Sequence, residues 1–124
     1  MNDQCANRRP RIMVVENEPL VRDVLADLLR PEFDVLTCST GLEALDRLAI
    51  DPLDAVLAEV DLVGMDGFEL RAHIARAWPD TAVLLITSDP IEADCWAWDD
   101  DCLIPNPFDA CACGAHIRRA VQAH

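Results

Sequence analysis

Short apolar runs alternate along the chain with segments whose apolar residues recur at helical spacing. Five runs have the length and nearly continuous apolar character of buried parallel strands, and they lie at residues 12–15, 34–37, 55–58, 83–86 and 102–104. A strand that is apolar on both faces requires helices on both sides of its sheet. The pattern therefore predicts an α/β protein in which a parallel sheet lies between two layers of helices.

The helical segments fall between these strands, as a doubly wound sheet requires. The first begins at Pro19 and ends before Pro31, and the second spans residues 41–50, where we expect Leu42, Leu45 and Leu48 to be buried. Further helices are predicted at residues 67–78 and 90–98, and a last one is capped by Asp109 and runs through Val121. Residues 1–9 are polar and are expected to form a flexible tail, which leaves residues 10–124 as one domain.

Composition limits the classes of partner. The formal net charge is −13 and no lysine is present, so nonspecific binding to DNA or to an anionic membrane is not expected. No apolar run is long enough to span a membrane and no signal segment opens the chain, which favours the cytoplasm. Six cysteines among 124 residues are too few for a disulfide scaffold. We expect mostly reduced thiols, with Cys38 and Cys113 in the core.

Polar residues follow the predicted strands. In sheets of this kind, ligands bind beyond the carboxyl ends of the strands. The segments at those positions are Glu16-Asn17-Glu18-Pro19, Glu59 followed by Gly64-Met65-Asp66-Gly67, Thr87-Ser88 and Asn106-Pro107-Phe108.

These segments, in this order and spacing, resemble the receiver-domain family of two-component signalling over nearly the whole chain. The resemblance implies a flavodoxin-like sheet in the order 2-1-3-4-5. In that family, acidic residues after the first strand bind Mg²⁺ together with a phosphoacceptor aspartate at the end of the third. A Thr or Ser hydroxyl and a lysine contact the phosphoryl group.

The chain differs from the family at most charged positions. By this resemblance, Glu16 and Asn17 take the places of the two acidic residues, Glu59 that of the phosphoacceptor and Asn106 that of the lysine. Only Thr87 matches. Leu103 lies where the family often has an aromatic switch residue. The amide of Asn17 is a weaker Mg²⁺ ligand than a carboxylate, so no cofactor is expected. Any Mg²⁺ would be bound by Glu16, Glu59 and Asp61.

Glu59 has two interpretations. It can act as a permanent negative charge that imitates an acyl phosphate, or it can simply bond to nearby backbone or water. The mimic lacks its counter-charge, because Asn106 replaces the lysine. Phosphorylation of Glu59, or of Asp61, is the further alternative, although Asp61 is only three residues before Gly64 where the family acceptor is five.

The cysteines and tryptophans suggest other roles. Cys95, Cys102, Cys111, Cys113 and His116 offer zinc-type ligands, but Cys111 and Cys113 point to different sides of a helix. Buried thiols are the simpler interpretation. Two tryptophans near the fourth helix are either core residues or anchors for a partner. They are Trp96 and Trp98.

The sequence thus predicts a stand-alone, atypical receiver-like module without enzymatic activity, acting by protein–protein contact with a histidine kinase, phosphotransfer or output protein. A homodimer is possible. Two alternatives stay open: a phospho-accepting regulator that uses a carboxylate, and a cysteine-based redox or metal sensor.

Overall fold

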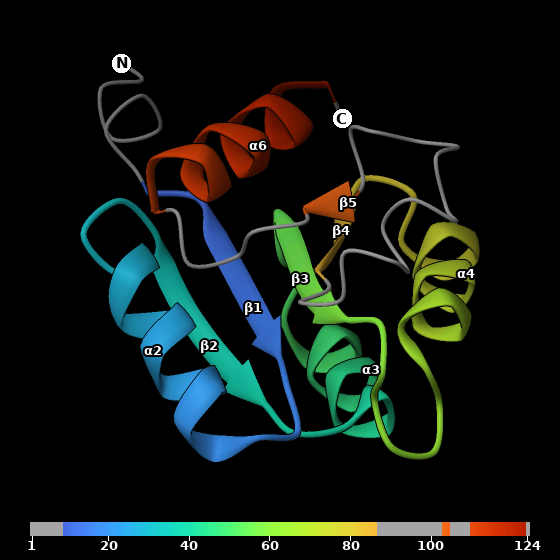
Figure 1. The fold of residues 1–124 in the computed structure, drawn as a ribbon. Helices are drawn as coiled ribbons and strands as arrows, with labels where there is room; N and C mark the ends of the chain where they lie inside the picture. Colours follow the sequence, from blue (N-terminus) through green and yellow to red (C-terminus); the bar gives the residue numbers. More distant parts are fainter. Residues whose placement is uncertain (1–8, 87–102, 105–109, 124) are drawn as a thin grey trace.

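The computed structural model describes residues 9–86, 103–104 and 110–123, with side chains placed for residues 9–86 and 114–123. A parallel sheet of five strands crosses the middle in the order β2-β1-β3-β4-β5 (Figure 1). The strands are β1 (Arg11–Val15), β2 (Asp34–Cys38), β3 (Ala55–Glu59), β4 (Ala82–Ile86) and β5 (Leu103–Ile104). The helices are α2 (Pro19–Leu29), α3 (Gly41–Ile50), α4 (Gly67–Ala77) and α6 (Ala110–Ala123). The predicted fold class and strand order are therefore confirmed.

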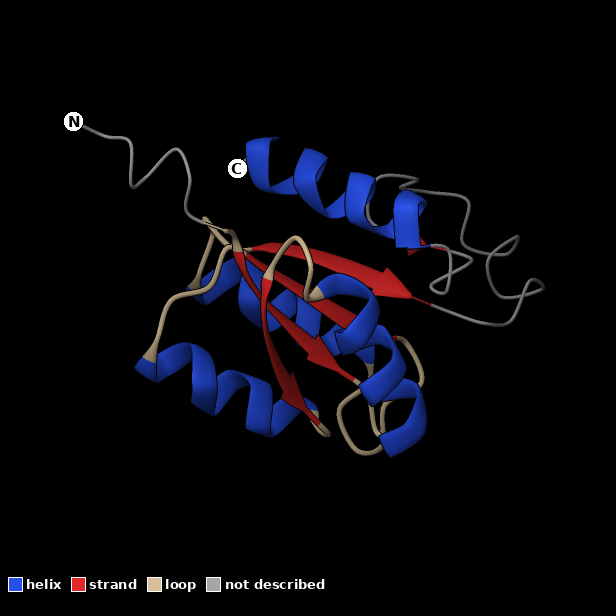
Figure 2. Cartoon of the chain, turned by 90° about the vertical axis from the view of Figure 1, so that its left-hand side faces the viewer, coloured by secondary structure: helices blue, strands red, loops and turns tan. Residues whose placement is uncertain are grey.

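The alternation of side chains along each strand builds two separate cores. In β1, Met13 and Val15 pack on the side of α3 and α4, whereas Ile12 and Val14 pack on the side of α2 and α6. All four side chains are fully buried. Helices cover both faces (Figure 2), which explains why the strands are apolar at nearly every position rather than at every second one.

Each helix begins where local chemistry favours a start. Pro19 opens α2, where its missing N–H removes a donor that would have no partner. Thr40 caps α3 by accepting a hydrogen bond from the backbone N–H of Glu43 at 3.1 Å. The Glu43 carboxylate accepts in return from the N–H of Ser39 at 2.8 Å. The predicted positions of these two helices are confirmed, with α2 ending at Leu29.

One prediction about α3 is wrong. Leu42 is 66% exposed, and the helix instead buries Gly41, Ala44 and Leu48. The buried stripe contains small residues, and Gly41 lies against the side chain of Met65 in the turn after β3. A hydrophobicity pattern weights leucine over glycine and alanine, so it assigned the wrong phase to the first turn.

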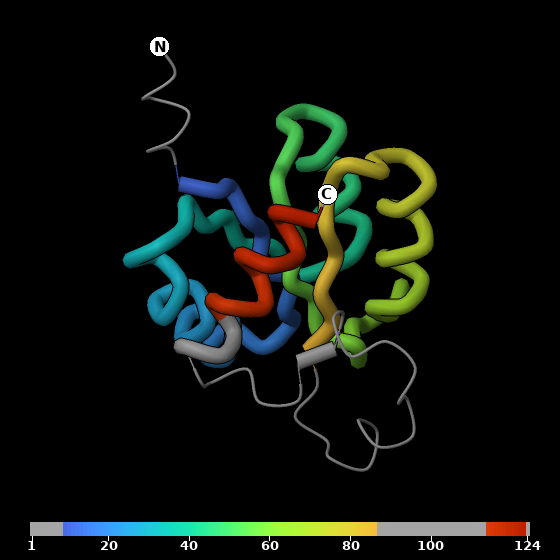
Figure 3. The backbone as a smooth tube through the Cα atoms, turned by 90° about the horizontal axis from the view of Figure 1, so that it is seen from above, coloured from blue at the N-terminus to red at the C-terminus, as the bar shows by residue number. Residues whose placement is uncertain are grey.

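The C-terminal half of the sheet is flanked by α4 and α6, which lie on opposite sides of β4 (Figure 3). Helix α4 ends at Ala77, one residue earlier than predicted, and Trp78 follows as its C-cap. The predicted helix at residues 90–98 and the cap residue Asp109 lie outside the described residues, as do residues 1–8. No helix in the described ranges combines the length and apolar character needed to cross a membrane.

Candidate functional site

The carboxyl ends of β1 and β3 place two glutamates side by side. Val15 is paired with Ala58 in the parallel register of these strands, so Glu16 and Glu59 occupy the next position on each. Glu59 is the last residue of β3, where it is paired with Ile86 of β4. The edge predicted from the sequence as a ligand site therefore carries two glutamates on neighbouring strands in the described structure.

Glu16 is held firmly in this edge. Its side chain is buried, and Oε2 accepts a hydrogen bond from the backbone N–H of Glu18 at 2.9 Å. Its own N–H donates to the carbonyl oxygen of Cys38 at 3.0 Å, and its carbonyl oxygen accepts from the guanidinium of Arg22 at 3.2 Å. Burial raises the pKa of Glu16 because water no longer stabilises the charged form, and the hydrogen bond from Glu18 opposes this rise only partly.

Glu59 is half-buried and bends toward its own loop. Its Oε1 accepts a hydrogen bond from the backbone N–H of Asp61 at 3.4 Å, which is near the upper limit for such a bond. This contact agrees with the interpretation in which Glu59 bonds to nearby backbone, although it leaves the mimic interpretation open. Asp61 itself is exposed on the loop that follows β3.

The turn after β3 is built around two glycines and a cap. Gly64 has a φ of +85°, a conformation that favours glycine. Asp66 caps α4 by accepting from the N–H of Glu69 at 2.8 Å. Gly67 opens α4, and a Cβ atom there would lie 2.7 Å from the carbonyl oxygen of Glu59. The N-terminus of α4 therefore approaches the backbone of Glu59 as closely as glycine alone permits.

Sequence reasoning identified this turn by resemblance and did not assign a packing role to Gly67. The signal that could have revealed it is the pair Asp66-Gly67 directly before a helical pattern. An N-cap followed by a residue without a side chain is typical of a helix end that lies against another backbone.

The described part of the acidic edge offers a divalent cation few charged oxygen donors. Besides Glu16 and Glu59 it offers the half-buried amide of Asn17, which is neutral. Oε2 of Glu16 and Oε1 of Glu59 already accept bonds from their own loops. Within the described ranges, no three His, Cys, Asp or Glu side chains gather into a metal-binding group. The expectation that the protein needs no Mg²⁺ stays a prediction.

Other predicted site residues belong to the C-terminal third of the chain. Thr87, Asn106, Trp96 and Trp98 lie outside the described residues. Leu103 is present only as backbone, in β5.

Among the cysteines, Cys38 is a free thiol in the core, as predicted, and its Sγ lies 3.0 Å from Sδ of Met13. Burial raises the pKa of Cys38 to about 11. Cys5, Cys95 and Cys102 are outside the described residues, and the side chains of Cys111 and Cys113 are not described.

A parallel five-stranded sheet with acidic residues at its carboxyl edge defines a flavodoxin-like α/β domain of the receiver class. Residues 12–95 match the family described as response regulator receiver domain. This match covers most of the chain, and the protein belongs to the receiver-domain family of two-component signalling.

Known relatives agree with this assignment. The chain is 30% identical over 121 residues to the DNA-binding transcriptional regulator NtrC of Escherichia coli K12, covering 93% of this chain and 25% of that protein. It is 39% identical over 79 residues to the transcriptional regulatory protein TcrA of Mycobacterium tuberculosis, covering 63% of this chain and 31% of that protein. Among solved structures, the signal receiver domain of an HD domain-containing protein from Pseudomonas fluorescens Pf-5 superposes with a TM-score of 0.79 at 27% identity, covering 94% of this chain and 97% of that one.

The chain spans no more than about a third of the length of these two curated regulators. The similarity therefore concerns only one part of each regulator. Whether the present domain acts alone stays a prediction.

Proposed function

We propose that this receiver domain acts mainly through protein–protein contact with other components of a two-component system, with little or no aspartyl phosphorylation. The observation that carries the proposal is the glutamate at the end of β3. Glu59 stands where the family has its acceptor aspartate, and its Oε1 accepts from the N–H of Asp61 in its own loop. A longer side chain that bends back onto its loop is poorly placed for attack on a phosphoryl donor.

The neighbouring residues support the same conclusion. Phosphoryl transfer to a carboxylate depends on a metal that offsets negative charge. Here Asn17 brings no charge, and desolvation favours the neutral, protonated form of Glu16. The chain has no lysine to stabilise a phosphoryl group. Each of these features weakens phosphotransfer.

The competing proposal is a phospho-accepting regulator. In that reaction a carboxylate oxygen attacks the phosphorus of acetyl phosphate, acetate leaves, and an acyl phosphate remains on the protein. Glu59 is the better candidate by position. Asp61 is exposed but lies two residues farther along the loop.

Intact-mass analysis after incubation with Mg²⁺ and acetyl phosphate distinguishes these proposals. We expect no phosphoryl adduct on the natural sequence. Glu59→Gln and Asp61→Asn serve as matched variants that remove one carboxylate each. The triple variant Asn17→Asp/Glu59→Asp/Asn106→Lys tests whether the family's charged residues restore the reaction in this fold.

A stable gain of one phosphoryl group that disappears in Glu59→Gln would establish the competing proposal. The same gain lost only in Asp61→Asn would place the acceptor at Asp61. A triple variant that gains the adduct while the natural sequence does not would identify the substituted residues as the cause.

The alternative of a cysteine-based redox or metal sensor has little support from the described cysteine. Cys38 is buried and its raised pKa keeps it protonated, whereas a reactive cysteine needs an accessible thiolate. Titration of the native thiols together with elemental metal analysis tests the remaining cysteines. Six reactive thiols without zinc after unfolding under non-reducing conditions would exclude both a disulfide and a metal site.

A further inference from the structure

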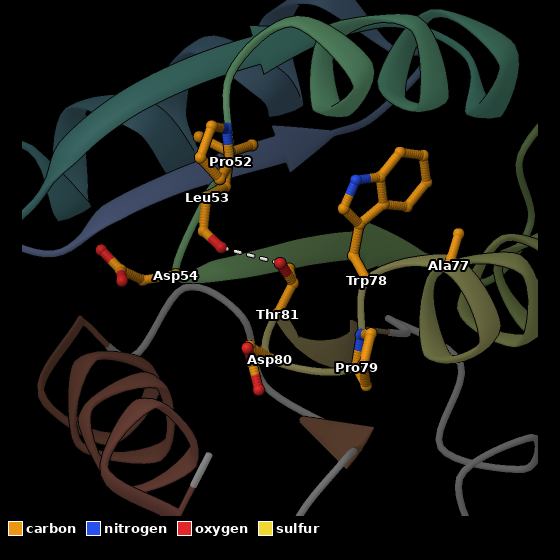
Figure 4. Close-up of a pocket in the computed structure, with 8 residues that line it drawn as sticks. All are labelled: Pro52, Leu53, Asp54, Ala77, Trp78, Pro79, Asp80 and Thr81. Atoms are coloured by element: carbon orange, nitrogen blue, oxygen red, sulfur yellow. Dashed lines mark hydrogen bonds between the residues drawn. The ribbon is translucent and has the colours of Figure 1, made fainter.

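A hollow of about 390 Å³ opens at the edge of the sheet opposite to Glu16 and Glu59 (Figure 4). Two short segments line it: residues 52–54, which enter β3, and residues 77–81, which join α4 to β4. Glu16 and Glu59 lie at the other end of the sheet, beyond or at the carboxyl ends of β1 and β3. The hollow is therefore a feature that the proposed function does not use, and its volume is in the range of ligand sites.

Hydrogen bonds hold the two walls together. Thr81 Oγ1 donates to the carbonyl oxygen of Leu53 at 2.8 Å, and the N–H of Ala82 donates to the carbonyl oxygen of Asp54 at 3.0 Å. The bond from Thr81 to Leu53 is buried and joins the two segments (Figure 4). The segment from Trp78 to Thr81 forms a turn closed by a bond from the N–H of Thr81 to the carbonyl oxygen of Trp78 at 3.0 Å, with Pro79 in the second position. The walls are thus preorganised.

The hollow has an apolar end and an acidic end. Pro52 and the half-buried indole of Trp78 stand on one side of the Leu53–Thr81 bond, and Asp54 and Asp80 lie on the other (Figure 4). Asp54 uses Oδ2 to accept from the N–H of Arg11 at 2.7 Å. Asp80 is exposed, and the ion pairs within the described ranges do not include it. None of the residues that line the hollow is cationic.

We propose that this hollow binds an arginine side chain of a partner protein. The methylene stem packs against Trp78 and Pro52, and the guanidinium is neutralised by Asp80 and Asp54. Arginine fits better than lysine because its planar head can pair with a carboxylate through two hydrogen bonds. The net charge of −13 attracts a basic partner over longer range. The proposal does not depend on the state of Glu59.

Titration followed by ¹H–¹⁵N NMR tests it with the full chain. The probe is the capped tripeptide acetyl-Gly-Arg-Gly-amide, and the control peptide replaces arginine by neutral citrulline. We expect saturable shifts at residues 52–54 and 77–81 and at one indole N–H, assigned with Trp78→Phe. The affinity should be on the order of millimolar, as for a single anchoring side chain. The citrulline peptide should bind about two- to fivefold more weakly.

Matched variants identify the residues responsible. Asp80→Asn should weaken binding of the arginine peptide about two- to fivefold and leave binding of the citrulline peptide unchanged. Asp23→Asn makes the same change of charge on α2, on the other face of the sheet, and should have no effect. Trp78→Phe should weaken both peptides while the rest of the amide spectrum stays folded.

Three results would overturn the proposal. Equal binding of the arginine and citrulline peptides would show that charge does not contribute. Equal losses in Asp80→Asn and Asp23→Asn would show that only the overall charge matters. Binding of free n-propylguanidine without binding of the peptide would assign the hollow to a small organic cation instead of a protein side chain. None of these results bears on phosphorylation at Glu59, so the two proposals fail independently.

Discussion

Gly67 offers the sharpest test of how the site is built. Replacing it by alanine adds a Cβ atom that would lie 2.7 Å from the carbonyl oxygen of Glu59 and 2.9 Å from Cα of Val60. Both are backbone atoms, so neither can move aside by a change of rotamer. The start of α4 must therefore shift away from the end of β3, and the bond from the Gly67 N–H to the carbonyl oxygen of Val60, 2.9 Å long, must stretch.

The change in the free energy of unfolding caused by Gly67→Ala follows from two opposing effects. Forcing an extra methyl-sized group into a packed contact costs about 1–3 kcal/mol. Alanine is the better helix former by up to about 1 kcal/mol inside a helix, but at the first position this gain is smaller. We expect a net loss of about 1–2.5 kcal/mol in the free energy of unfolding. For an m-value of about 1.5 kcal/mol/M, the midpoint of urea unfolding should fall by about 0.7–1.7 M.

Two other glycines provide controls in the same neighbourhood. At Gly41 a Cβ would lie 3.1 Å from Sδ of Met65, a flexible side chain that can give way, so Gly41→Ala should change stability by less than about 1 kcal/mol. At Gly64 a Cβ would meet no atom within 4 Å, but the φ of +85° makes alanine cost about 1–2 kcal/mol. Circular dichroism followed through a urea titration measures all three. A Gly67→Ala protein as stable as the natural one, or more stable than Gly41→Ala, would refute the account of the turn.

Two further predictions concern buried groups. Because the folded-state pKa of Glu16 is raised above its ordinary value of 4.5, its contribution to stability is complete below pH 4.5 and is lost as the pH rises through the folded-state pKa. Glu16→Gln should remove that part of the pH dependence of stability. The difference in urea midpoint between the variant and the natural protein should therefore grow as the pH rises above 4.5. A difference that stays constant with pH would contradict the raised pKa of Glu16. Cys38, with a pKa of about 11, should resist iodoacetamide at pH 8 in the folded protein and react fully in urea, as mapped by mass spectrometry of its peptide. Modification of Cys38 at the same rate in both states would show that the core opens readily.

Much of the fold could be predicted because its strands are apolar on both faces. Runs such as Ala55–Glu59 and Ala82–Ile86 admit few other interpretations once helical segments separate them. The prediction was wrong at Leu42, because the buried face of α3 includes the small residues Gly41 and Ala44 instead. Hydrophobic patterns find the elements, but close contacts between small residues decide the exact phase of a helix.

The candidate site could be located from sequence but not described. The positions of Glu16 and Glu59 at the carboxyl ends of adjacent strands follow from the predicted strands and their order. Which backbone N–H each carboxylate accepts from depends on side-chain rotamers, and these have no signature in the sequence. The hollow beside Trp78 was missed because its residues come from two loops that carry no recognisable motif.

The structure separates the residues that shape this edge of the sheet from those that would perform chemistry there. Gly64, Asp66 and Gly67 are each explained by backbone geometry: a positive φ, a helix cap and a close approach to Glu59. None of these reasons requires that a phosphoryl group ever binds. A chain can therefore keep the whole turn for stability while its charged residues change, and the turn alone is no argument for phosphorylation. That argument has to come from the side chains of Glu16, Asn17 and Glu59, where the charge and the reach differ from those of the family.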